Sequence, residues 1–173
     1  MRDLFQQELR EVQDQLVSIA ELVASSITDA VEAFNKSDVT LAESVIARDN
    51  QIDDAVVQLD EHAITILARQ SPVAKDLRIV VSALRISSSL ERMGDMAEHL
   101  AQLARYRFPE KVVPKTIRPT FKEMGALDIG MANMLVDLLR NGDTDLAQKI
   151  RDEDDKVDAL HLSVFETVLS DTW

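Results

Sequence analysis

Hydrophobic residues recur at intervals of three and four along most of this chain, beginning with a series that runs from Phe5 to Phe34. Such spacing places the apolar side chains on one face of an α-helix. No segment alternates apolar and polar residues for long, as a half-buried strand would. The pattern therefore predicts an all-α fold.

Polar residues and proline mark where the first three helices begin and end. The first helix should cover residues 3–35, and Ser37 and Asp38 can accept hydrogen bonds from the free N–H groups that open the second. Pro72 separates the second helix from the third, because proline disfavours helical geometry in the residue before it. The third helix should end at Phe108-Pro109.

The second part of the chain contains a linker and two further helices. Proline and lysine residues between positions 109 and 119 are typical of a linker between two bundles. The fourth helix should run from Pro119 to Arg140, where Asn141-Gly142 provides a left-handed stop. The fifth should start at Asp143 and continue to the last residue, Trp173.

The sequence contains an internal repeat with an offset of 105 residues. Asp38-Val-Thr-Leu-Ala-Glu aligns with Asp143-Thr-Asp-Leu-Ala-Gln, and Ile52-Asp53 aligns with Val157-Asp158. The offset pairs the first helix with the fourth and the second with the fifth, and leaves the third without a counterpart. We therefore predict a three-helix unit over residues 1–110 and an incomplete second unit, lacking its third helix, over residues 111–173.

Two antiparallel helices leave one apolar flank open. Either the chain was cut before a sixth helix, or the second unit borrows a third surface. In both cases we expect the second unit to be the less stable part of the chain or to be covered by another chain.

Composition and charge exclude several classes of protein. The chain has 31 Asp and Glu against 19 Lys and Arg, a net charge of −12, so it repels the phosphate backbone of nucleic acids. It has no Cys, which excludes disulfides, thiolate metal sites and a Cys nucleophile. No apolar stretch approaches the ~20 residues that cross a bilayer, and the N-terminus has no signal-peptide pattern. We expect a soluble, cytoplasmic protein.

Two pairs of acidic residues lie beside apolar seams. Asp49 and Asp53 flank the seam of the second helix, and the fifth helix carries Asp154 and Asp158 at the repeat offset. Spacing alone proves nothing in so acidic a chain, but recurrence beside a seam is informative. Like charges at this spacing repel each other, and more so when partly buried, so each pair needs a counter-charge.

The third helix adds another acidic face. Glu91 and Asp95 are one turn apart, and Gly94 between them predicts a close approach of another group to the backbone. The counter-charge is either a metal ion, which carboxylate-rich bundle sites commonly hold, or basic side chains such as Arg85 and Arg92. A further interpretation is that the acids only form a solvated surface.

Two longer motifs lie at residues 68–78 and 90–95. Residues 68–78, Ala-Arg-Gln-Ser-Pro-Val-Ala-Lys-Asp-Leu-Arg, are similar to the joint between the second and third helices of the PhoU family of phosphate-signalling regulators. Residues 90–95, Leu-Glu-Arg-Met-Gly-Asp, resemble its "LERIGD" segment, and the duplicated D-x-x-x-D pattern also fits. The resemblance implies two tandem three-helix bundles, the second of which is truncated here to two helices.

The resemblance also implies bound metal, because family members hold multinuclear iron or zinc clusters through acidic motifs on the second and third helices of each bundle. Carried onto this sequence, the first site would consist of Asp49, Asp53, Glu91 and Asp95, and half of a second would consist of Asp154 and Asp158. Two positions depart from the family pattern. Ser89 stands where the family usually has Asp, and His99, where it often has Asn, could add a ligand.

The function implied by the resemblance is that of a non-enzymatic negative regulator of phosphate uptake and phosphate-starvation signal transduction. Such a protein would be an adaptor, a homodimer that reaches the membrane only through its partners, the ATPase of the phosphate ABC transporter and a sensor histidine kinase. The residues themselves form no catalytic or cofactor-binding constellation, such as a Gly-rich phosphate cradle. The alternative is a ferritin-like di-metal oxidase or metal-storage bundle using Asp154, Asp158 and His161.

Overall fold

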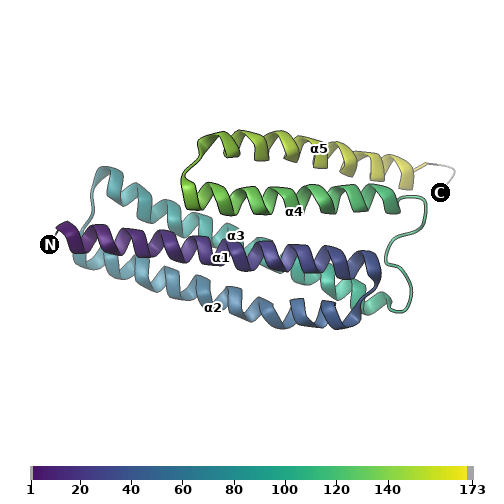
Figure 1. Cartoon of the computed structure of the whole chain (residues 1–173), viewed down its shortest axis with the longest axis horizontal. Coiled ribbons are helices and arrows are strands. Elements are labelled where there is room, and N and C mark those ends of the chain that lie inside the picture. The colour runs from purple at the N-terminus through teal and green to yellow at the C-terminus, as the bar shows by residue number, and fades with distance from the viewer. Residues whose placement is uncertain (1, 171–173) are drawn as a thin grey trace.

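The computed structural model describes residues 2–170, with side chains from residue 5 onward, and contains five α-helices. They are α1 (Arg2–Lys36), α2 (Val39–Gln70), α3 (Ala74–Arg107), α4 (Arg118–Asn141) and α5 (Thr144–Val168). α1, α2 and α3 pack together as an antiparallel bundle, α4 lies along α1, and α5 packs on α4 (Figure 1). The predicted all-α, bundled fold is confirmed.

Of the two residues predicted to cap the second helix, Asp38 does so, whereas the hydroxyl of Ser37 donates its hydrogen bond to the carbonyl of Glu110 instead. Asp38 caps α2 by accepting a hydrogen bond from the backbone N–H of Leu41, at 3.0 Å. At the repeat-related position, the carboxylate of Asp143 accepts one from the backbone N–H of Asp145. Gly142 ends α4 in the left-handed conformation, with a φ of 67°. Local sequence signals therefore fix the start of both α2 and α5.

The predicted end of α5 is wrong. The helix stops at Val168, and Leu169 and Ser170 are non-helical, whereas the last part of the predicted helix, residues 171–173, lies outside the described residues. Most helical stability in proteins comes from the packing of an apolar face. The end of α5 has little to pack on, since Leu169 is 79% exposed.

The core of the α1–α3 bundle consists of two clusters of buried residues, and Ile27 packs against both. One cluster contains alanine side chains from all three helices: Ala30, Ala33, Ala42, Ala97, Ala101 and Ala104. Larger side chains fill the rest of the bundle, among them Ile19, Ile52, Leu59, Ile66 and Leu90. This close packing positions the backbones of α2 and α3 for the acidic site described below.

α4 packs against α1 through small residues. Its buried residues are Gly125, Ala132 and Val136. A Cβ atom added to Gly125 would lie only 2.7 Å from Cγ1 of Val31 on α1, so glycine allows the two helices to approach. By contrast, none of the residues of α5 is buried. The second part of the molecule therefore consists of a helix held by α1 and a helix that lies on its outer side.

Membrane insertion of a helix is not indicated. Within residues 2–170, no helix has an apolar stretch that is long enough to span a bilayer.

Candidate metal centre

Three carboxylates converge on the surface between α2 and α3. One oxygen each of Asp49 and Asp53, from α2, and of Asp95, from α3, lie within 4.8 Å of one another. Asp53 is exposed, and Asp49 and Asp95 are half-buried. The structure thus brings together three of the four residues assigned to the first predicted site.

Gly94 allows the two helices to meet at this point. A Cβ atom added to Gly94 would lie 3.0 Å from Cδ1 of Ile52 and 3.3 Å from Oδ1 of Asp49. The close approach predicted from a glycine inside α3 is therefore confirmed, and the group that approaches is α2 itself. The absence of a side chain at residue 94 leaves room for the Asp49 carboxylate beside Asp95.

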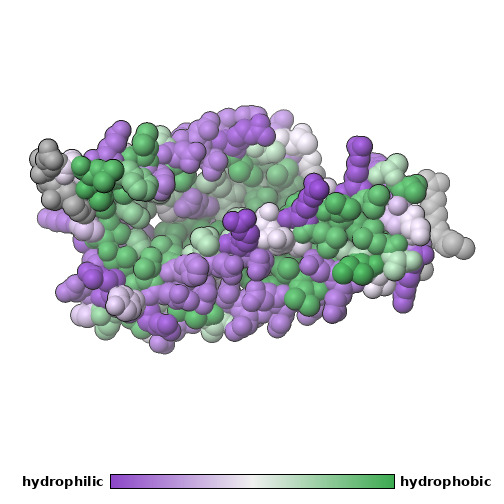
Figure 2. Space-filling model, turned by 180° about the vertical axis from the view of Figure 1, so that it is seen from behind, coloured by the Kyte–Doolittle hydropathy of each residue, from purple (hydrophilic) through white to green (hydrophobic). Residues whose placement is uncertain are grey.

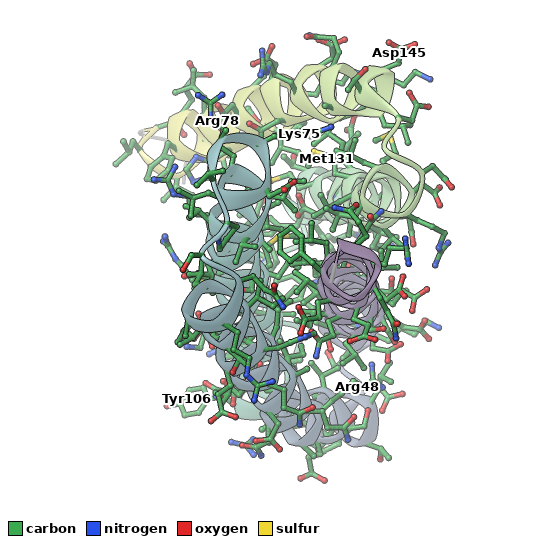
Figure 3. All side chains as sticks on the ribbon, turned by 90° about the vertical axis from the view of Figure 1, so that its left-hand side faces the viewer. Arg48, Lys75, Arg78, Tyr106, Met131 and Asp145 are labelled. Atoms are coloured by element: carbon green, nitrogen blue, oxygen red, sulfur yellow. The ribbon has the colours of Figure 1, made fainter. Side chains whose placement is uncertain are left out.

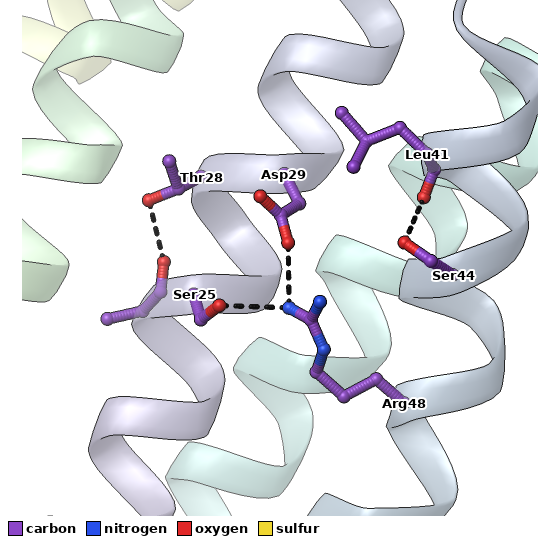
Figure 4. Close-up of polar contacts among 7 residues, drawn as sticks. Ser25, Thr28, Asp29, Leu41, Ser44 and Arg48 are labelled. Carbon is purple, nitrogen blue, oxygen red and sulfur yellow. Dashed lines mark hydrogen bonds and ion pairs between the residues drawn. The ribbon is translucent and has the colours of Figure 1, made fainter.

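Arg48, the residue before Asp49, ties α2 to α1. Its guanidinium donates hydrogen bonds to the carboxylate of Asp29 at 2.8 Å and to the hydroxyl of Ser25 at 2.9 Å (Figure 4). Both charged side chains are about three-quarters buried, which makes this pair more than a solvated surface contact. The link holds this turn of α2, and hence Asp49, in a fixed place on the bundle.

The carboxylates destabilise one another's charged form. Burial, followed by the neighbouring charges of Asp53, Glu98, Asp95 and Glu91, raises the pKa of Asp49 from its ordinary value of 3.8 to about 6. The cluster therefore carries more negative charge than its surroundings compensate.

Basic side chains such as Arg85 and Arg92 do not provide the missing positive charge. Among the described residues, no Lys or Arg side chain lies within 4.0 Å of the carboxylates of Asp49, Asp53 or Asp95. Arg92 instead lines a groove on another side of α3. Three uncompensated carboxylates on two facing helices fit a hard or borderline cation, which binds oxygen ligands.

Two other predicted ligands lie at the edge of this group or away from it. Glu91 contributes to the electrostatic field at Asp49 but is not one of the three converging carboxylates. Glu98, one turn beyond Asp95, contributes to the same field and was not among the assigned ligands. His99 lines a separate hollow with Tyr106. Helical spacing alone could not predict which of these side chains come closest to Asp49 and Asp53, because that depends on the register between α2 and α3.

The second acidic pair does not assemble into a site of three ligands. Asp154 and Asp158 are both exposed on α5, and no group of three potential ligands forms around them in residues 5–170. The carboxylate of Asp128, on the neighbouring helix α4, interacts with Asp154: burial, followed by the charge of Asp154, raises the pKa of Asp128. Asp128 was not predicted, since it occupies the repeat position of the buried Val23.

Asp128 lies in an open groove of about 610 Å³ between α3 and the α4–α5 hairpin. Figure 2 shows this groove as an apolar hollow with hydrophilic rims. Its lining comes from four helices and includes Met93, Met96, Met131, Leu135 and Ile150. The open apolar flank predicted for the second unit is thus present along α5.

His161, the ligand suggested for the alternative di-metal site, packs edge-on against Phe165, with ring centroids 4.9 Å apart. It belongs to no group of three potential ligands in the described residues. The arrangement around α5 gives the oxidase interpretation no assembled site.

Comparison with known proteins gives consistent matches over nearly the whole chain. The PhoU domain model matches residues 16–104 and 121–172. The phosphate-specific transport system accessory protein PhoU homolog 2 of Mycobacterium tuberculosis is 33% identical over 173 residues, covering 100% of this chain and 81% of that relative. The PhoU homolog of Aquifex aeolicus is 38% identical over 154 residues, covering 89% of this chain and 69% of its own length.

The fold has a close counterpart among solved structures. The crystal structure of PhoU from Pseudomonas aeruginosa superposes with a TM-score of 0.86 and 29% sequence identity, and the match covers 95% of this chain and 78% of that one. Sequence, motifs and fold agree, and the chain belongs to the PhoU family.

Proposed function

We propose that this protein is a regulatory accessory protein of phosphate uptake. Its relatives carry the name phosphate-specific transport system accessory protein, and the similarity extends over all or most of this chain. The absence of a nucleophile beside a base or of a phosphate cradle in the sequence supports a non-enzymatic role.

In finer terms, we propose a cytoplasmic, homodimeric adaptor that represses phosphate-starvation signalling. It would contact the ATPase of the phosphate ABC transporter and a sensor histidine kinase. Five long helices with exposed charged faces suit such a role, because they offer extended surfaces for protein contacts.

We also propose that Asp49, Asp53 and Asp95 bind iron or zinc, with Glu91 and Glu98 as outer acids. The observation that carries this proposal is the convergence of three carboxylate oxygens within 4.8 Å, with no Lys or Arg side chain within 4.0 Å of them among residues 5–170. A bound cation would reverse the sign of the local field, after which an anion such as phosphate could approach. Asp154 and Asp158 would form half of a second site.

We further infer that the chain comprises two related units, residues 1–110 and 111–173. The internal offset and the two separate segments matched by the family model support this division. In the second unit, a helix equivalent to α3 would fill the groove beside Asp128 and face the Asp154/Asp158 pair.

The metal proposal is tested by measuring the metal content of the untreated protein and of two matched double variants. Asp49→Asn with Asp53→Asn should lower bound iron or zinc at least tenfold, because two of three ligands lose their charge. Asp154→Asn with Asp158→Asn, the same change at the repeat positions, should leave the content of the first site unchanged. Equal metal content in all three proteins would contradict the assignment.

The regulatory proposal is tested separately by capture of the transporter ATPase and the kinase from a phosphate-replete extract. The wild-type protein should retain both. Dioxygen-dependent turnover of the iron-loaded protein, without capture of either partner, would favour the oxidase alternative.

A further inference from the structure

The last turns of α3 and the linker that follows concentrate positive charge in an acidic protein. Residues 105–122 contain six Lys and Arg against one Asp or Glu, whereas the whole chain contains 19 against 31. Part of this charge offsets the negative end of the α3 dipole. The cations extend well beyond that helix end into the linker, so the dipole does not account for all of them.

Large apolar side chains lie exposed among these cations. The exposed fractions are 86% for Tyr106, 58% for Phe108 and 49% for Leu103. Tyr106 projects outward from the bundle, on the side away from α4 and α5 (Figure 3). It lines a hollow of about 550 Å³ together with Leu103 and Arg105. We call Leu103, Arg105, Tyr106, Phe108 and Lys115 the α3-end patch.

The cations of the patch are available to a partner. Within residues 2–170, neither Arg105 nor Lys115 has a carboxylate within 4.0 Å, and both are exposed. The single acid of this segment, Glu110, pairs with Arg107 at 3.4 Å. The patch therefore offers uncompensated positive charge, and Arg105 lines the same hollow as Tyr106.

The linker beside the patch is anchored to the bundle. The hydroxyl of Ser37 donates a hydrogen bond to the carbonyl of Glu110 at 3.1 Å, and Nζ of Lys111 donates one to the carbonyl of Asn35 at 2.8 Å. Val113 and Ile117 are buried against Phe34. These contacts hold the linker beside the patch against the bundle at one end of the molecule.

We propose that the α3-end patch rests directly on an anionic lipid bilayer. Tyr106 and Phe108 enter the headgroup region, where aromatic side chains are favoured, and Arg105 and Lys115 contact lipid phosphates. An anionic bilayer complements both features of the patch, because its headgroup region accommodates aromatic rings and its phosphates attract the cations. Acids elsewhere on the molecule interfere little, because salt screens charges beyond about 8 Å.

This contact is additional to attachment through the transporter, and it does not depend on the proposed regulatory function. It is tested by sedimentation with vesicles of phosphatidylcholine alone or mixed equally with phosphatidylglycerol. The protein should bind the mixed vesicles, should not bind the neutral ones, and should be released by high salt. Arg105→Glu with Tyr106→Ala should reduce the bound fraction about tenfold.

The control is Arg69→Glu with Val73→Ala, which removes one exposed cation and one exposed apolar side chain near the α2–α3 turn, at the other end of the bundle (Figure 1). It should bind like the wild type. A direct readout is also available, since Tyr106 is the single tyrosine of the chain. Its nitration should be slowed by mixed vesicles and unaffected by neutral ones.

The proposal is overturned if the protein remains in the supernatant with both kinds of vesicle, or if the two double variants bind equally well. A third outcome would assign the patch to a protein contact and likewise overturn the bilayer contact. In it, the wild type does not bind vesicles, and the Arg105/Tyr106 variant no longer captures a protein partner that the wild type retains.

Discussion

The α1–α3 bundle and the α4–α5 hairpin carry the same acidic pattern in different surroundings. In the bundle, Asp49 and Asp53 face α3 and meet Asp95. In the hairpin, Asp154 and Asp158 are exposed beside an open groove. The D-x-x-x-D motif therefore becomes a candidate metal site where a facing helix brings a carboxylate within reach of both acids, as Asp95 does, whereas Asp128 near Asp154 forms no such group in residues 5–170.

The same contrast holds for apolar packing, and its largest expected effect is on stability. Ile52 on α2 is 1% exposed, while its repeat equivalent on α5, Val157, is only half-buried. Ile52→Ala should lower the free energy of unfolding by about 3 kcal/mol through lost burial and a cavity, whereas Val157→Ala should cost about 1 kcal/mol or less. Urea unfolding followed by circular dichroism measures both. Similar losses would show that the two parts are equally well packed.

Much of this contrast could be predicted from the sequence. The spacing of apolar residues, the cap at Asp38 and the stop at Gly142 locate the helices, because these signals are local. The internal repeat also predicted that the second unit has an apolar flank without a third helix to cover it. The end of α5 was misplaced because no proline or glycine after Val168 marks a stop, whereas Leu169 is exposed and gains little packing from a longer helix.

The candidate site was predicted less completely than the fold. Gly94 correctly indicated a close helix contact, and Asp49, Asp53 and Asp95 converge. The sequence could not separate Asp95 from Glu91, since both lie on one face of α3 and only the register with α2 decides which one reaches Asp49. Asp128 was missed because its environment is created by α5 and the groove, neither of which leaves a mark on the local sequence.

A second pair of substitutions tests how α4 is held. Gly125→Ala places a methyl group 2.7 Å from the stiff Val31 side chain, so it should push α4 from α1 and destabilise the protein by about 1 to 2 kcal/mol. Gly130→Ala, in the same helix, meets nothing within 4 Å and should stabilise it by up to about 1 kcal/mol through helix propensity. Thermal unfolding distinguishes the signs; stabilisation by both would mean that the α1–α4 contact is loose.

The acidic cluster should make the metal-free bundle more stable in mild acid. The pKa of Asp49 is raised to about 6, above its ordinary 3.8, so the folded state binds more protons between these values and loses stability as the pH rises through them. Because the side chain is partly exposed, we expect only about 1 kcal/mol from this group. Unfolding with a chelator at pH 4.5 and pH 7 should reveal it.

Asp49→Asn provides the control for the pH experiment, because it removes the titrating group and retains its shape. Asp128 also has a raised pKa and contributes with the same sign, so the effect of Asp49 is the difference between wild type and variant. If the free energy of unfolding depends on pH in the same way in the variant and the wild type, the charge of Asp49 does not destabilise the folded state.

The smallest expected difference concerns the two helix caps and shows whether α5 folds with the rest. Asp38→Ala should cost about 1 kcal/mol of global stability, because α2 unfolds together with the bundle. Asp143→Ala removes an equivalent hydrogen bond, but α5 packs on α4 and has no buried residue of its own. If α5 opens before the bundle does, the lost cap accelerates amide hydrogen exchange in α5 about fivefold while the global midpoint hardly moves. Equal global losses from both variants would instead place α5 in the same cooperative unit as α2 and remove the main difference between the two halves.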